Sequence, residues 1–180
     1  MGRLPFIAGN WKMNKTVEEA IELVRPLKSS ISDIKGVEVA VAPPFTALYA
    51  VGQELKGSSI RLAAQNLFWE EKGAFTGEVS SLMIKEVGCQ YVIIGHSERR
   101  QFFGEIDEAV NRKIKAAWRQ GLKPIFCVGE TLREREDGKT FSIIEKQVEG
   151  GLKEIGEQVI KNIVIAYEPV WAIGTGKTAT

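Results

Sequence analysis

Short apolar segments that alternate with longer amphipathic ones constrain the fold of this chain more than any other feature. Each segment has four to six residues and is largely apolar, without the alternation of a half-exposed strand. The segments span residues 6–9, 37–42, 60–64, 91–94, 124–128 and 163–167. Continuous apolarity is typical of strands in a parallel sheet, so we expect six parallel strands buried on both faces.

Amphipathic helices are predicted between these strands. Thr16 followed three residues later by Glu19 is a capping-box signature, and apolar residues follow it at helical spacing. The same spacing predicts helices over residues 106–120 and 140–155. Strands that alternate with helices indicate successive right-handed βαβ units in an α/β fold. No linker or composition break occurs, so residues 1–180 should form one domain, either an open doubly wound sheet or part of a (β/α)8 barrel.

The composition excludes several classes of partner. The formal net charge is +1, with 26% charged residues, which provides no electrostatic attraction to nucleic acid or an anionic membrane. No apolar run is long enough for a transmembrane helix, and the first residues lack the apolar core of a signal peptide. Cys89 and Cys127 lie in apolar sequence and are expected to be buried thiols. We therefore expect a cytoplasmic protein with no nucleic-acid or membrane partner.

Three polar residues follow predicted strands, at the strand ends where parallel α/β folds place their active sites. Lys12 comes after the first strand, His96 after the fourth and Glu168 after the sixth. A fixed ammonium suits a phosphate or an oxyanion, and a carboxylate at such a place suits a general base. Ser97 is predicted to begin a helix, whose positive end would keep His96 neutral.

Each of these residues also has a structural alternative. The lysine could simply reach solvent, the histidine could be structural, and the glutamate could pair with a lysine. No metal cluster accompanies them, because one histidine and two distant cysteines cannot form a zinc site. Taken together, a base, an electrophile and a cation without a metal favour proton abstraction next to a carbonyl.

The glycine-containing segment after Glu168 resembles two nucleotide-binding motifs only superficially. The first glycine of a P-loop ending at Gly176 would fall at Trp171. A dinucleotide fingerprint requires an acidic residue about twenty positions later, beyond the end of this sequence. A lid between a rigid Pro-Val-Trp start and a Lys-Thr-Ala end is the interpretation that we favour.

Seven sequence blocks resemble the triosephosphate isomerase family, in the family's order and spacing. They are AGNWKMN (8–14), APPF (42–45), QN (65–66), GAFTGE (73–78), GHSERR (95–100), CVGE (127–130) and AYEPVWAIGTG (166–176). The resemblance implies a parallel (β/α)8 TIM barrel, of which this chain supplies roughly the first six strands. It also implies an isomerase of glycolysis and gluconeogenesis that interconverts dihydroxyacetone phosphate and glyceraldehyde 3-phosphate through an enediolate, without a cofactor.

The resemblance also implies roles for individual residues. Glu168 would be the base and His96 the neutral electrophile, an assignment for which this family is itself the standard illustration. Lys12 and Asn10 would bind the substrate, with Glu98 as the partner of the lysine. Ser97 would support the site.

A closing lid and a dimer loop are implied as well. The Gly174 amide would bind the substrate phosphate. The lid would comprise Pro169, Val170, Trp171, Ala172, Ile173, Gly174, Thr175, Gly176, Lys177, Thr178 and Ala179. Closure of such a lid excludes water and protects the intermediate.

Family members are typically homodimers, and residues 66–79 match the loop that docks into the neighbouring subunit. Thr76 would be the tip of this loop, supported by Gln65, Glu78 and Arg99. An ordinary surface loop is the alternative. The aromatic residues of the segment would leave much apolar area exposed on a monomer, which favours an interface.

A complete (β/α)8 barrel takes about 250 residues, whereas this sequence ends at Thr180. The last two strand–helix units, with their phosphate-binding loops, are therefore expected to lie outside it. We expect little isomerase activity from the 180 residues alone. The alternative to an active enzyme is a catalytically silent barrel fragment that self-associates or needs a complementing C-terminal piece.

Overall fold

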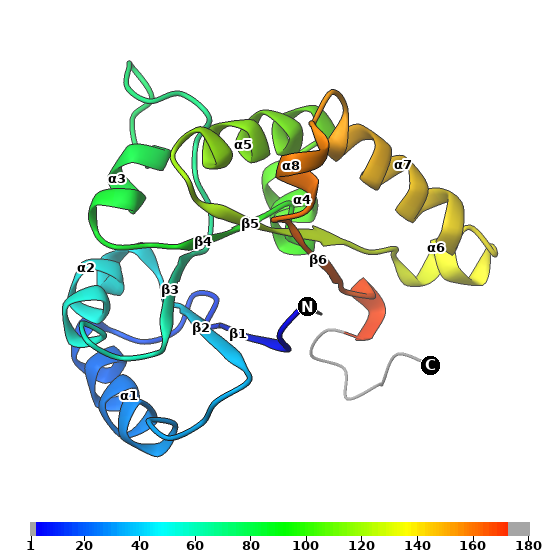
Figure 1. Cartoon of the computed structure of the whole chain (residues 1–180). Coiled ribbons are helices and arrows are strands. Elements are labelled where there is room, and N and C mark those ends of the chain that lie inside the picture. Colours follow the sequence, from blue (N-terminus) through cyan, green and yellow to red (C-terminus); the bar gives the residue numbers. More distant parts are fainter. Residues whose placement is uncertain (1–2, 173–180) are drawn as a thin grey trace. The chain divides into compact units, whose positions relative to one another are not determined.

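The computed structural model describes residues 3–172 and contains the six expected strands (Figure 1). Each begins and ends within one residue of its predicted bounds. The strands are β1 (Phe6–Asn10), β2 (Glu38–Ala42), β3 (Arg61–Ala64), β4 (Tyr91–Ile94), β5 (Lys123–Val128) and β6 (Val164–Tyr167). The strand order is β1-β2-β3-β4-β5-β6, and the strand pairs whose register is resolved are parallel. This sequential order is that of a (β/α)8 barrel, and it excludes the doubly wound alternative, in which the strand order reverses.

Helices connect the strands, and the longest ones were predictable from the sequence. They are α1 (Val17–Ser30), α2 (Phe45–Glu54), α3 (Ser81–Glu86), α4 (Ser97–Phe103), α5 (Asp107–Arg119), α6 (Leu132–Glu136), α7 (Thr140–Leu152) and α8 (Glu157–Ile160), followed by the 3-10 turn η1 (Val170–Ala172). The capping box of α1 is confirmed, because Thr16 and Glu19 each accept the backbone N–H of the other. The sequence pattern missed α2, which is apolar on most sides, and the short helices α3, α6 and α8.

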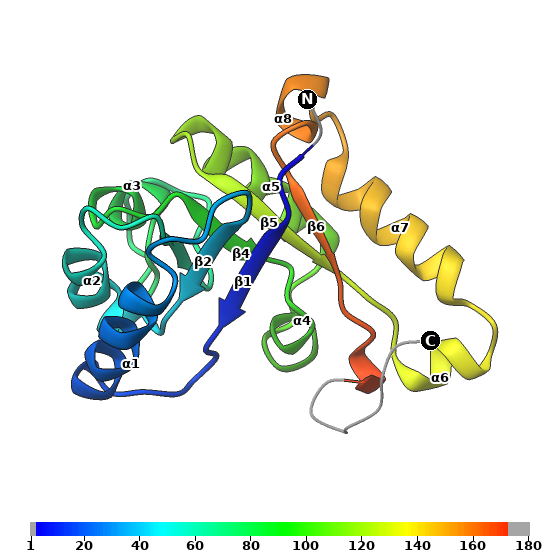
Figure 2. The same ribbon diagram turned by 60° about the horizontal axis from the view of Figure 1, so that its bottom comes forward.

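The chain divides into two compact units. The first contains the residues up to 92 together with 120–122, and the second contains residues 93–119 and the residues from 123 on. In the first unit β1 pairs with β2, and α1 lies beside α2 (Figure 1). In the second unit β5 pairs with β6, which lies beside it in Figure 2, and α5 and α7 pack against β5. The single domain predicted from the sequence stays a prediction.

The expectation that every strand is buried on both faces is wrong for β1 and β6. Strands β4 and β5 are buried almost throughout, whereas Ile7 of β1 is 60% exposed and Ile165 of β6 is 50% exposed. These two strands stand at the ends of the strand order. A neighbouring strand therefore covers them on one side only within the described residues.

Both cysteines are free and buried, as the sequence indicated. Burial raises the pKa of the Cys89 thiol to about 12, so this side chain stays protonated at neutral pH. Among the residues that the structure describes, no helix combines the length and the apolarity that a bilayer crossing requires.

The close contact between β5 and α7 depends on a glycine. The Phe126 side chain of β5 is fully buried, and a Cβ on Gly151 of α7 would lie 2.5 Å from its Cζ atom. A real Cβ does not approach a ring carbon so closely, so the helix can reach the strand only because residue 151 has no side chain.

We predict that Gly151→Ala lowers the free energy of unfolding by about 1–3 kcal/mol, because overpacking outweighs the better helix propensity of alanine. Urea unfolding followed by far-UV circular dichroism measures this change. Phe126→Leu is the matched background, since it removes the ring that the new methyl group would meet. In the Phe126→Leu background, Gly151→Ala should lower the free energy of unfolding by a smaller amount. An equal loss in both backgrounds would contradict the packing explanation.

Candidate active site

Gly95, which follows β4, fixes the backbone that carries His96. Its φ angle is +75°, and a Cβ would lie 3.2 Å from the Cys127 carbonyl oxygen, so a larger residue would be strained. The Gly95 N–H donates to Glu105 Oε1 at 3.0 Å, and its carbonyl accepts from Arg100 Nε at 2.9 Å. Side chains thus hold both backbone polar groups of this residue.

His96 is the N-cap residue of α4, at the helix start that the sequence predicted. Its Nδ1 atom accepts the Glu98 N–H at 3.2 Å, which places the proton of the neutral ring on Nε2. The Glu98 carboxylate comes within 3.5 Å of the same Nδ1 atom, but that nitrogen is already occupied by the backbone donor. The ring is buried, and it lies at the N-terminal end of the helix.

Glu105 supports this arrangement from inside the second unit. Its buried carboxylate accepts Arg99 Nε at 2.9 Å and Lys113 Nζ, in addition to the Gly95 N–H. Burial raises the pKa of this carboxyl group, but the Lys113 ammonium and the Arg99 guanidinium lower it more, so the pKa lies below its usual range. The group is therefore a charged anchor for the peptide before His96.

Glu168 lies directly after β6 and contacts the residue that follows β5. Its N–H donates to the Val128 carbonyl at 2.8 Å, which continues the strand pairing by one residue. A Cβ on Gly129 would collide with the Glu168 carbonyl group. The backbone of the glutamate is therefore seated against a glycine.

The His96 and Glu168 side chains meet in the second unit. Nε2 of the imidazole lies 3.2 Å from Oε2 of the carboxylate. That oxygen is buried, and within residues 3–172 it has no hydrogen-bond partner. An unsatisfied buried carboxylate oxygen next to an N–H donor is suited to accept a proton while the donor polarises a carbonyl.

The start of the predicted lid is held by a second buried carboxylate, Glu130. It accepts the Tyr167 hydroxyl at 3.0 Å and the Trp171 Nε1–H at 3.1 Å, and Arg135 both pairs with it and stacks over the Trp171 ring. Burial raises the pKa of this carboxyl group, but a hydrogen bond from the Glu130 backbone, together with those from Trp171, Tyr167 and Arg135, lowers it below its usual range. The predicted rigid start of the lid is therefore ordered at η1, whereas residues 173–179, with Gly174, lie outside the described residues.

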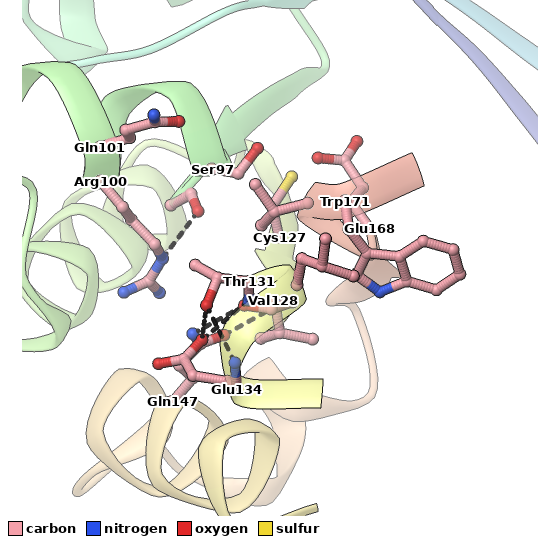
Figure 3. A pocket seen from close by; sticks show the side chains of 14 residues that line it. Ser97, Arg100, Gln101, Cys127, Val128, Thr131, Glu134, Gln147, Glu168 and Trp171 are labelled. Carbon is pink, nitrogen blue, oxygen red and sulfur yellow. Dashed lines mark hydrogen bonds between the residues drawn. The ribbon is translucent and has the colours of Figure 1, made fainter. Parts of the chain in front are cut away.

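A cavity of about 530 Å³ opens beside these groups (Figure 3). Glu168, Ser97 and Cys127 line it, together with Trp171 and Gln147. Over the described part of the chain, no group of three or more His, Cys, Asp or Glu side chains could hold a metal ion.

Asn10 and Lys12 belong to the first unit. Asn10 Oδ1 accepts the Lys12 N–H at 3.1 Å, and Lys12 has a φ angle of +53°, a strained value for a side-chain-bearing residue. Gln65 donates its amide to the Lys12 carbonyl at 2.9 Å and to the Ala42 carbonyl at 2.8 Å. Its side chain thus holds the strained turn, and the convergence of these residues with His96 and Glu168 stays a prediction.

The predicted dimer loop folds around its own aromatic residues. Phe68 contacts Trp69, with ring centroids 4.1 Å apart, and Phe75, at 4.6 Å. Phe75 remains 43% exposed, and Thr76 and Glu78 are also exposed. Arg99 pairs with Glu105 in the second unit. The contribution of Arg99 and Gln65 to an interface stays a prediction.

Sequence reasoning missed several residues that shape the site: Glu105, Lys113, Gly129, Glu130, Arg135 and Gln147. The strand-end rule applied to the fifth strand would have identified Gly129 and Glu130, which follow β5 directly. Gln147 gave no signal, because a polar residue on an amphipathic helix usually faces solvent.

Comparison with known proteins gives a consistent result. A family model described as triosephosphate isomerase matches residues 5–180. Proteins named triosephosphate isomerase from Endomicrobium trichonymphae and Geotalea uraniireducens are 62% and 60% identical to this chain over 178 residues, 99% of this chain and 71% of each relative. The crystal structure of triosephosphate isomerase from Bartonella henselae is 44% identical, with a TM-score of 0.87 over 94% of this chain and 69% of that one.

We predict that Glu105 makes stability depend on acidic pH. Its folded pKa lies below the usual value of 4.5, so the carboxylate stabilises the fold above that pH, and the stabilisation is lost as the pH falls through the folded value. Glu105→Gln should therefore lower the free energy of unfolding near neutral pH by about 3 kcal/mol, because two cations lose their partner. Urea unfolding as a function of pH measures both effects.

The free energies of unfolding of the unaltered protein and of Glu105→Gln should become more similar as the pH is lowered below 4.5. Glu157→Gln is the matched control, since Glu157 pairs with Lys161 at an exposed position and should contribute little. A Glu105→Gln deficit that stays constant down to acidic pH would contradict the prediction.

Proposed function

This chain belongs to the triosephosphate isomerase family, and we propose that, as an isomerase of that family, it interconverts dihydroxyacetone phosphate and glyceraldehyde 3-phosphate. The observation that carries the proposal is the contact between His96 Nε2 and Glu168 Oε2 at 3.2 Å. It places a ring nitrogen next to an unsatisfied carboxylate oxygen beside a cavity. These are the two groups needed to move a proton next to a carbonyl.

The reaction follows from the chemistry of these two groups. Glu168 removes a proton from the carbon next to the substrate carbonyl, and the His96 N–H donates a hydrogen bond to the carbonyl oxygen. Negative charge develops on that oxygen, and the donor stabilises the resulting enediolate. Proton transfer between the two oxygens and return of a proton from Glu168 to the neighbouring carbon complete the isomerisation, with no net gain or loss of atoms.

Asn10 and Lys12 bind the substrate in this proposal. A lysine ammonium attracts the phosphate and the developing oxyanion, and Gln65 keeps the Lys12 backbone in its strained conformation. Glu98 pairs with the lysine, and the lid from Pro169 to Ala179 closes over the phosphate with the Gly174 amide. The reaction requires no metal or cofactor and belongs to glycolysis and gluconeogenesis in the cytoplasm.

We further propose a homodimer formed through residues 66–79. Support comes from apolar side chains that remain exposed in and beside this loop. Phe75 is 43% exposed, Met83 is 51% exposed, and both line one small cavity with Phe68. Burying such a patch against a second copy gains hydrophobic free energy, and Thr76 would lie at the centre of the contact.

We predict that Glu168→Gln and His96→Gln each lower isomerisation at least about a hundredfold, because each removes a group that acts on the reacting atoms. A coupled assay measures turnover, and proton NMR in deuterated water measures exchange at the substrate carbons. Glu157→Gln, at an exposed ion pair, is the control and should leave both rates unchanged. Rates in the two site variants equal to that of the unaltered protein would refute the proposed roles.

We predict that Thr76→Glu lowers the molar mass found by light scattering, because a charge at the loop tip would be desolvated in the interface. Ser32→Glu, at an exposed position outside the loop, is the control and should leave the mass unchanged. An identical mass for both variants would count against an interface through residues 66–79.

A further inference from the structure

Gln147 of α7 makes a pair of hydrogen bonds to the backbone of one residue, Gly129. Its Oε1 atom accepts the Gly129 N–H at 2.9 Å, and its Nε2 atom donates to the Gly129 carbonyl at 3.0 Å. Figure 3 shows the Gln147 side chain among those that line the cavity. A single amide thus satisfies both polar groups of one glycine, and it fixes the orientation of that residue relative to α7.

The same glycine is the surface on which the Glu168 backbone rests. The residue before it, Val128, accepts the Glu168 N–H at 2.8 Å, and the Glu168 carbonyl occupies the space that a Gly129 side chain would fill. The residue after it, Glu130, accepts the Val170 N–H at 3.0 Å. A shift of Gly129 therefore cannot leave Glu168 in place.

We propose that Gln147 is a positioning residue for Glu168, acting through the Gly129 peptide. Within the described residues its amide hydrogen-bonds Gly129 and neither the Glu168 carboxylate nor the His96 ring. Its amide holds the glycine, the glycine holds the glutamate backbone, and the carboxylate thereby stays 3.2 Å from His96 Nε2. The role deepens the proposed function, since a displacement of about 1 Å at a reacting group can cost as much as a hundredfold in rate.

The chemistry of the residue supports this role over simple packing. An amide supplies one acceptor and one donor, one for each backbone polar group of Gly129, whereas an apolar side chain of similar size would leave the Gly129 N–H and carbonyl without these partners. Asn111 offers a comparison within the same unit. Its amide also bonds backbone carbonyls, those of Gly151 and Lys153 at 3.0 and 2.8 Å, but neither carbonyl belongs to the turn that supports Glu168.

His96 is the only histidine in the chain, so its ring nitrogens give a single set of NMR signals that report on the neighbouring carboxylate. In the full chain, Gln147→Met should move the His96 Nε2 signal toward its position in Glu168→Gln. Gln147→Asn, which keeps the amide but is one carbon shorter, should move it in the same direction and serves if the methionine variant does not fold. Asn111→Leu should leave the signal unchanged.

The Glu168→Gln background separates positioning from a general loosening of the fold. Once the carboxylate is absent, Gln147→Met should no longer shift the His96 signal. The proposal would be overturned if the folded Gln147 variants kept the His96 Nε2 signal of the unaltered protein. It would also be overturned if Gln147→Met shifted this signal equally with and without the Glu168 carboxylate.

Turnover provides the second measurement. Gln147→Met should lower kcat about tenfold or more while KM stays within about twofold, because the substrate-binding groups are unaffected. Asn111→Leu should change neither parameter. An unchanged kcat in a Gln147 variant with a shifted His96 signal would also overturn the role. Absence of isomerase turnover in the unaltered protein, even when a complementing C-terminal piece is supplied, would refute the proposed function, whereas the His96 signal would still decide whether Gln147 positions Glu168.

Discussion

The parallel pairing of β5 with β6 is the constraint on which the candidate site depends. The register places Val128 opposite Tyr167, and the next residues along the two strands are Gly129 and Glu168. Because both strands run in the same direction, their last residues lie at the same edge, and the glutamate necessarily meets the glycine. A shift of one residue would turn the Glu168 side chain to the other face of the strand pair. The pairing of β5 with β6 thus determines the direction of the Glu168 side chain independently of any side-chain contact.

Three glutamates of the second unit differ in how their buried oxygens are satisfied. Glu105 and Glu130 each accept several hydrogen bonds or ion pairs, and the pKa of each lies below its usual range because these contacts outweigh the effect of burial. Glu168 keeps one buried oxygen without a hydrogen-bond partner in the described chain. Satisfied carboxylates act as fixed anchors, whereas an unsatisfied one can still accept a proton. This difference supports the proposal that Glu168, rather than Glu105 or Glu130, is the base.

The sequence predicted the elements of this fold well, because buried parallel strands are short, apolar and bounded by polar residues. It also singled out His96 and Glu168, because each follows the end of a predicted strand, but their catalytic roles stay a proposal. It could not predict the burial of individual positions in β1 and β6, which depends on neighbours in space. Nor could it identify Gln147, whose partner Gly129 lies 18 residues away and offers only its backbone. Backbone groups are alike in every residue, so the residue types at two positions do not reveal that the side chain of one binds the backbone of the other.

Both candidate catalytic side chains are supported through a glycine whose N–H and carbonyl are held by side chains. Gly95 precedes His96 and is held by Glu105 and Arg100, while Gly129 contacts Glu168 and is held by Gln147. Each glycine is required by a close approach, to the Cys127 carbonyl in one case and to the Glu168 carbonyl in the other. A glycine allows the backbone to come close, but it also leaves the chain free to rotate. The bound side chains remove that freedom, so each pair combines close approach with rigidity, which is what a base and an electrophile 3.2 Å apart require.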